Sequence, residues 1–185
     1  FSEDTRLIGI GTINDINLYR EMVGAGITDY LVKPVTEKAL AAALCRTEEP
    51  VAGPPGEQTV TKKARRIVVV GSRGGVGASS IAVNLACILS QERKLRTALI
   101  DLDLEFGTVA LSLDLEPTRG LREALESPAR IDSLFIESAT AKVSEHLSVM
   151  ATEETLAQEI AFNPSAIDVL LEAVGRGSDQ IIIDM

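Results

Sequence analysis

A glycine-rich turn between a strand-like run and a helix-like run constrains this chain more than any other feature. Residues 66–70 form a β-branched run with a basic flank, typical of a strand buried on both faces of a parallel sheet. Residues 71–80 read GSRGGVGASS, and apolar residues then recur with helical spacing over 79–91. At such a turn, backbone N–H groups and a helix N-terminus face outward and favour a phosphate group.

The spacing of this turn distinguishes between two phosphate-binding patterns. It does not fit GxGxxG, the pattern of nicotinamide and flavin dinucleotide sites. It fits GxxxxGK(S/T) better, with Ser72 in the first glycine position, Ala78 in the lysine position and Ser79 supplying the hydroxyl for Mg²⁺. The alternative is a glycine-rich turn that binds nothing. On the phosphate-loop interpretation, the nucleotide-binding residues are Arg73, Gly74, Gly75, Val76, Gly77, Ala78, Ser79 and Ser80.

Three aspartates stand where predicted strands end. Asp101 and Asp103 follow the strand predicted over 97–100, and Asp184 ends the strand predicted over 180–184. Open α/β sheets bind ligands at the carboxyl ends of their strands. We therefore expect Ser79, Asp101 and Asp184 to hold Mg²⁺, and Asp103 to be the catalytic residue that positions an attacking water. The alternative is that each aspartate caps the turn after its strand.

Residues 47–63 divide the chain. They hold three prolines and two glycines without a periodic apolar pattern, which is typical of a linker. We expect a domain over 1–46, a linker over 47–63 and a second domain over 64–185. The first residue is not Met and the last residues interrupt a strand-like run, so we expect the chain to be part of a longer protein.

Both domains alternate strands with helices, which is typical of a parallel α/β sheet. In the first domain, strands are predicted over 7–11 and 29–32, and Asn14 or Asp15 caps one helix and Thr36 the next. In the second domain, strands are predicted over 66–70, 97–100, 147–150 and 180–184, with helices over 79–91 and 121–125 and one opened by Pro164.

Composition excludes several classes of function. The chain has 185 residues, 18 of them basic and 27 acidic, and a net charge of −9 makes binding to nucleic acid unfavourable. Two cysteines, Cys45 and Cys87, cannot form a disulfide framework, so we expect a cytoplasmic protein in which both thiols are buried. No apolar run reaches the roughly 18 residues of a membrane span. Any membrane contact is therefore expected to be indirect or to use segments outside this chain.

The phosphate loop and the aspartates resemble those of the MinD/ParA ATPases. RGGVGAS is similar to the KGGVGKT of that family, with Arg73 in place of its signature lysine and Ala78 in place of its second lysine. Asp101 and Asp103 match its D-x-D motif, and Asp184 matches its Walker B aspartate. The resemblance covers residues 64–185 and implies a doubly wound parallel sheet of the P-loop NTPase type, with ATP and Mg²⁺ as cofactors.

The first domain resembles the last part of a response-regulator receiver domain, which has a flavodoxin-like fold. Residues 29–34 read DYLVKP, similar to that family's final strand, and Thr12 matches its switch residue. The strands that carry the phosphoacceptor in that family are not in this sequence. No phosphorylation site is therefore assigned.

A receiver-like module followed by a MinD/ParA-like domain with an altered loop resembles the CpaE/TadZ proteins of tight-adherence (Flp-type) pilus assembly. The resemblance extends to residues 14–15 and 18–20 and to Phe106-Gly107. It implies a cytoplasmic localisation factor that forms a homodimer and binds proteins of the pilus secretion apparatus. It also implies recruitment to a cell pole or to the inner-membrane face.

Ala78 decides how much enzymatic activity to expect. A methyl group cannot replace the lysine that contacts the β- and γ-phosphates, so hydrolysis is expected to be slow at most. Three roles stay open for Arg73: it contacts the phosphate, it acts across a dimer as the resemblance implies, or it is exposed to solvent without a partner. Three alternatives stay open: an active Mg²⁺-dependent ATPase that uses Arg73, an atypical response regulator, and a scaffold that never binds nucleotide.

Overall fold

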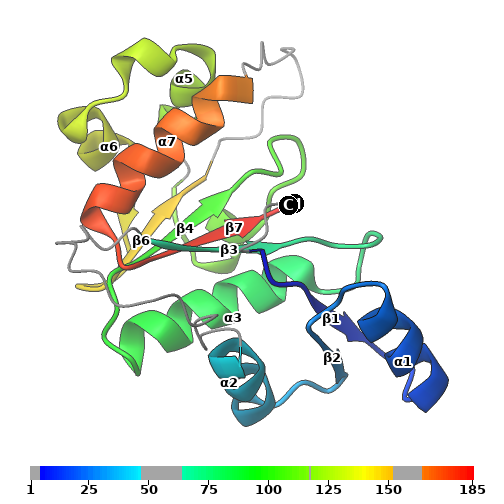
Figure 1. Ribbon diagram of the computed structural model, residues 1–185. Coiled ribbons are helices and arrows are strands. Elements are labelled where there is room, and N and C mark those ends of the chain that lie inside the picture. Colours follow the sequence, from blue (N-terminus) through cyan, green and yellow to red (C-terminus); the bar gives the residue numbers. More distant parts are fainter. Residues whose placement is uncertain (1–4, 47–63, 117, 152–163) are drawn as a thin grey trace, which may run out of the picture. The chain divides into compact units, whose positions relative to one another are not determined.

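The computed structural model describes residues 5–46, 64–116, 118–151 and 164–185, which fall into two compact units (Figure 1). The units divide between residues 58 and 59, and each is described by itself. The predicted linker, 47–63, lies outside the described residues. Within the described residues, no helix is both long enough and apolar enough to span a bilayer.

The first unit consists of two parallel strands and two helices. They are β1 (Ile8–Gly11), α1 (Ile16–Gly24), β2 (Asp29–Val32) and α2 (Glu37–Arg46). The Asp15 carboxylate accepts hydrogen bonds from the backbone N–H groups of Asn17 and Leu18, which caps α1. Likewise, the Thr36 hydroxyl accepts one from Ala39 N–H at the start of α2. The structure confirms both predicted strands and both predicted caps.

The second unit is a five-stranded sheet in the order β3-β7-β4-β6-β5. Its first four strands pair in parallel, and the short β5 pairs antiparallel to β6. Helix α3 covers one face of the sheet, and α5, α6 and α7 lie on the other (Figure 1). The elements are β3 (Arg65–Val69), α3 (Ala78–Gln91), β4 (Thr97–Asp101), α4 (Val109–Ser112), α5 (Gly120–Glu126), η1 (Pro128–Arg130), α6 (Ser133–Ala139), β5 (Ala141–Lys142), β6 (Leu147–Met150), α7 (Pro164–Gly177) and β7 (Gln180–Asp184).

The core of this unit lies on both faces of the two central strands, β4 and β7. Every residue of β4 is buried, and so are Ile181, Ile182, Ile183 and Asp184 of β7. Ile181 and Ile183 pack with α5 and α7 residues in the main apolar cluster. Central parallel strands read as continuous apolar runs because helices cover both of their faces. That pattern made β4, β6 and β7 predictable from the sequence.

The prediction for the strand before the glycine-rich turn was wrong in one respect. This strand, β3, was expected to be buried on both faces, but Val68 is 52% exposed and Val70, just after it, is 67% exposed. Among the described residues, β3 pairs only with β7 and so forms an edge of the sheet. Apolar composition alone does not distinguish an edge strand from a central one. The strand also begins one residue earlier than predicted, at Arg65.

Two further differences concern short elements and a thiol. The sequence analysis did not identify α4, η1, α6 or β5. Elements of two to seven residues contain few repeats of a periodic pattern, so only some of them, such as α5, can be identified from sequence. Cys45 is exposed rather than buried, while Cys87 is half-buried in α3 and burial raises the pKa of its thiol.

We predict that Gly120→Ala destabilises the second unit. A Cβ at Gly120 would collide with the side chain of Ala139 and lie 2.6 Å from its Cα, so α5 and α6 would have to separate. Overpacking of this kind costs about 1–3 kcal/mol of unfolding free energy, which urea unfolding measures.

Gly175→Ala in α7 is the matched control. A Cβ there would make an ordinary 3.4 Å contact with Ala64, and the helix propensity of alanine favours the change by up to about 1 kcal/mol. Equal unfolding free energies for the two variants would contradict the packing of α5 against α6.

Candidate functional site

The turn between β3 and α3 has the backbone that an anion-binding loop needs. Gly75 and Gly77 have φ angles of 73° and 85°, in the left-handed region where residues with a Cβ are strained. Gly77 directly precedes α3, and no side chain caps the first N–H groups of this helix. These N–H groups, together with the helix dipole, are available to an anion at the end of the turn.

Strand pairing brings the predicted aspartates to the same edge as this turn. Asp101, at the end of β4, lies opposite Asp184, at the end of β7. Asp184 in turn lies opposite Val69, the last residue of β3. Beyond the strands, Gly71 N–H donates to the carbonyl of Met185 at 3.2 Å, which fixes the start of the turn beside the end of β7.

Asp184 is the buried carboxylate of the site. It is 2% exposed and accepts a hydrogen bond from the Ser79 hydroxyl at the start of α3. Burial raises its pKa, the Ser79 hydrogen bond lowers it, and the negative charge of Asp103 raises it. Its Oδ1 atom is buried without a hydrogen-bond partner among the described residues. Because a buried carboxylate oxygen without a partner is costly, this atom marks where a cation or a donor fits.

Asp101 uses both carboxylate oxygens to hold the loop that follows it. One accepts from Val109 N–H at 3.1 Å and the other from Asp103 N–H at 3.2 Å. A Cβ at Gly107 would collide with the Asp101 carboxylate and lie 2.6 Å from the Asp103 carbonyl oxygen, so the loop requires glycine there. Burial raises the pKa of Asp101 to about 6, although the two N–H groups lower it. This geometry corresponds to the turn-capping alternative for Asp101.

Asp103 also stabilises the loop. Its Oδ1 accepts from Phe106 N–H at 3.0 Å, and its carbonyl accepts from Gly107 N–H at 2.9 Å. Unlike Asp101 and Asp184, Asp103 is exposed. It therefore remains accessible to a ligand while it caps the turn.

The structure thus brings Ser79, Asp101, Asp103 and Asp184 to one edge of the sheet, with unequal roles. No set of three or more His, Cys, Asp or Glu side chains in the described part of the chain is arranged to hold a metal by itself. Mg²⁺ commonly takes one or two protein oxygens and completes its shell with water and phosphate. The Ser79 hydroxyl and Asp184 Oδ1 suit that type of site, whereas the oxygens of Asp101 are already engaged.

The glycine-rich turn itself presents one cation. Arg73 is exposed, and within the described ranges no hydrogen bond or ion pair joins it to another residue. Ala78, in the lysine position, is the first residue of α3 and has only a methyl group to present. Asp103 and Glu105 are exposed in the loop that follows β4, so this edge of the sheet carries more acidic than basic side chains.

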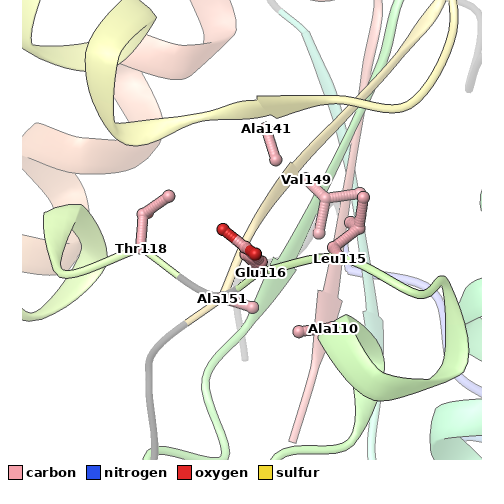
Figure 2. A pocket seen from close by; sticks show the side chains of 7 residues that line it. All are labelled: Ala110, Leu115, Glu116, Thr118, Ala141, Val149 and Ala151. Carbon is pink, nitrogen blue, oxygen red and sulfur yellow. The ribbon is translucent and has the colours of Figure 1, made fainter.

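A small hollow lies near α4 and is separate from this site (Figure 2). It contains none of the predicted nucleotide- or metal-binding residues, and it has room for about one water, which is too little for a nucleotide. Sequence reasoning missed this hollow and the role of Gly107 in the loop. One sequence feature does mark this region of the chain: residues 97–118 contain five carboxylates and no basic residue.

The chain resembles known proteins over its second unit. Residues 67–171 match the family described as "CobQ/CobB/MinD/ParA nucleotide binding domain". The antiactivator FleN of Pseudomonas aeruginosa is 34% identical over 70 residues, which are 38% of this chain and 25% of FleN.

Solved structures also resemble the chain, and two of them are compared with it. A ParA family ATPase from Chlorobium tepidum has a TM-score of 0.59 at 25% identity, covering 65% of this chain and 51% of that one. The septum site-determining protein MinD of Pyrococcus horikoshii, complexed with Mg-ADP, has a TM-score of 0.55 at 22% identity, covering 65% and 48%. The chain therefore spans about a quarter of FleN and about half of these structures.

We predict that the raised pKa of Asp101 gives the second unit a stability that falls as the pH rises. Its carboxyl binds a proton in the folded state up to about pH 6 but releases it near 3.8 when unfolded. Between these values the folded state holds more protons, so the unfolding free energy decreases with pH, by at most about 3 kcal/mol.

Asp101→Asn should make this decrease smaller in urea-unfolding curves measured across the same pH range, and what remains comes from Asp184, whose pKa burial also raises. Asp168→Asn, which removes an exposed carboxylate from α7, is the matched control and should retain it. Parallel pH profiles for the wild type and Asp101→Asn would contradict the burial of an ionisable Asp101.

Proposed function

This chain belongs to the CobQ/CobB/MinD/ParA nucleotide binding domain family, and we propose that it is part of an ATP-responsive positioning factor. On this proposal, residues 64–185 are the family's P-loop domain, 47–63 are a linker and 1–46 are the end of a receiver-like domain. The parallel pair of β1 and β2, flanked by α1 and α2, is compatible with that last assignment. The combination of modules supports a cytoplasmic role in assembling a tight-adherence type pilus, at a cell pole or at the inner-membrane face.

The observation that carries the nucleotide proposal is the orphaned oxygen of Asp184 beside Ser79. A hydroxyl and a carboxylate oxygen suit Mg²⁺, and the uncapped N-terminus of α3 suits a phosphate. Ser79 and Asp184 would hold the metal, and Gly74 to Ser80 would bind the phosphates. When bound, Mg²⁺ would neutralise phosphate charge and polarise the bond to the γ-phosphate. MinD of Pyrococcus horikoshii was solved with Mg-ADP, which supports the same ligand class here.

On the same proposal, Ala78 makes nucleotide binding weak and ATP hydrolysis slow. A lysine charge 4 Å from a phosphate charge contributes up to about 4 kcal/mol at an effective dielectric constant of 20, before desolvation reduces it. The loop N–H groups and the helix dipole remain for ground-state binding. Stabilisation of the transition state depends more on the missing charge, because negative charge on the phosphate must be held in a fixed geometry.

We predict that Ala78→Lys increases the affinity for Mg-ATP by about tenfold, because it restores a cation at the phosphates without moving the loop. Calorimetric titration of Mg-ATP into both proteins measures the change. Asn84→Lys is the matched control: it adds the same charge at an exposed position farther along α3 and should leave the affinity unchanged.

An active ATPase that uses Arg73 is the second candidate. The observation that favours it is that Arg73 is exposed and, in the described part of the chain, makes no hydrogen bond or ion pair that would hold it away from a phosphate. Wild-type turnover near 1 s⁻¹, lost in Arg73→Ala, would establish this candidate in place of a degenerate site.

We also propose that the turn between β3 and α3 forms a homodimer, as the resemblance to MinD/ParA ATPases implies. Two such edges meet with Asp103 and Glu105 on each side, so their like charges oppose association. Mg²⁺ and Arg73 offset that repulsion.

Arg73→Ala is predicted to weaken dimerisation in the presence of Mg-ATP by about tenfold, because it removes the cation of the turn. Sedimentation velocity of wild type and variant, with and without Mg-ATP, measures this. Arg93→Ala, an exposed arginine between α3 and β4, is the matched control. A wild type that is monomeric under every condition would remove the interface and the role of Arg73 together.

A further inference from the structure

The loop that follows β4 closes on the buried carboxylate of Asp101. One oxygen of this carboxylate accepts from Val109 N–H at 3.1 Å, and the other accepts from Asp103 N–H at 3.2 Å. Gly107 N–H donates to the Asp103 carbonyl at 2.9 Å, and Phe106 N–H donates to Asp103 Oδ1 at 3.0 Å. These hydrogen bonds hold the loop in one tight conformation.

The loop is tightest at Gly107. A Cβ there would collide with an oxygen of the Asp101 carboxylate, and it would lie 2.6 Å from the Asp103 carbonyl oxygen and 2.7 Å from Asp101 Cγ. These atoms do not move aside easily, because Asp101 is 2% exposed and the carbonyl belongs to the backbone. The φ angle of Gly107 lies outside the left-handed region, so glycine is needed for space rather than for conformation. An alanine at this position would therefore push the loop away from Asp101.

The same loop begins at the proposed cation site. Leu102 N–H donates to the Asp184 carbonyl at 2.9 Å, which fixes the residue before Asp103 against the end of β7. The negative charge of Asp103 contributes to the raised pKa of Asp184, so the two carboxylates lie within electrostatic reach of each other. Asp103 is exposed, and its Oδ2 atom accepts no hydrogen bond from the described residues. The conformation of the loop therefore sets how close an accessible carboxylate lies to Asp184.

We propose that Gly107 is a positioning residue of the proposed nucleotide site. By letting its loop close tightly, it holds the Asp103 carboxylate beside Asp184, where the negative charge of Asp103 strengthens the binding of Mg²⁺ and of the nucleotide that comes with it. Gly107 has no side chain to offer a ligand and acts through Asp103. This inference rests on the proposed function, because it takes Ser79 and Asp184 as the residues that hold the cation.

The sign of the electrostatic effect separates this role from a merely structural one. The Asp103 carboxylate attracts Mg²⁺, but it repels the phosphates of ATP when no cation is present. ATP is therefore titrated calorimetrically into the full chain twice, once with MgCl₂ and once with EDTA. Gly107→Ala should weaken ATP binding about tenfold with Mg²⁺ and should not weaken it with EDTA. A distorted phosphate loop would lower the affinity under both conditions.

Two further variants complete the experiment. Asp103→Asn keeps a side-chain oxygen that can accept from Phe106 N–H but removes the charge, so it should weaken Mg-ATP binding by about the same factor. Adding Gly107→Ala to Asp103→Asn should cause little further loss, because both changes act through one carboxylate. Gly177→Ala is the matched control: a Cβ at this exposed end of α7 meets nothing within 4 Å, so this variant should bind ATP as the wild type does.

Four outcomes would overturn the proposal. A Gly107→Ala variant that binds Mg-ATP as the wild type does would show that the tight closure has no effect on the site. An equal loss with Mg²⁺ and with EDTA, or a loss that adds fully to that of Asp103→Asn, would make the role of Gly107 structural. A Gly107→Ala variant without a urea-unfolding transition would make the glycine a requirement of the fold. A wild type whose ATP affinity does not depend on Mg²⁺ would contradict the proposed function itself, and this inference with it.

Discussion

The parallel pairing of β4 with β7 is the constraint on which the rest of the second unit depends. At one end of this pair, Arg96 and Asp179 form a two-point ion pair, with contacts of 2.8 and 3.1 Å. At the other end, the register sets Asp101 beside Asp184. Two buried carboxylates on neighbouring strands repel each other, and burial raises the pKa of both. The fold supports this arrangement only because each carboxylate receives hydrogen bonds from its surroundings.

The two aspartates differ in the hydrogen bonds that their carboxylates accept. Asp184 accepts a hydrogen bond from the Ser79 hydroxyl, and its Oδ1 atom has no partner among the described residues. A buried oxygen without a partner is typical of a group that binds a ligand. Both carboxylate oxygens of Asp101 accept hydrogen bonds from the loop that follows it, so Asp101 stabilises that loop. The loop in turn presents Phe106 and leads into α4 with Leu111. One pair of strands therefore organises both the proposed nucleotide site and the loop that leads into α4.

On our proposal, the residue in the lysine position separates nucleotide binding from catalysis in this chain. The left-handed glycines 75 and 77 and the N-terminus of α3, which no side chain caps, have the geometry of an anion site, and glycine costs conformational freedom to maintain there. Ala78 removes the charge that such a site uses on the γ-phosphate. If the proposed function is correct, dimerisation is the activity to measure, because it does not require the missing charge.

The sequence by itself determined the strands that end on Asp101 and Asp184, the caps Asp15 and Thr36, and the glycine-rich turn between a strand and a helix, because each depends on neighbours along the chain or on a continuous apolar run. Only the tertiary structure decided which residues compete for the same space and the same hydrogen bonds. It placed β3 at an edge and closed the loop on Gly107. It also opened the hollow at Glu116, whose walls come from α4, β5 and β6. Contacts between elements far apart in sequence leave no local pattern, and these features consist of such contacts.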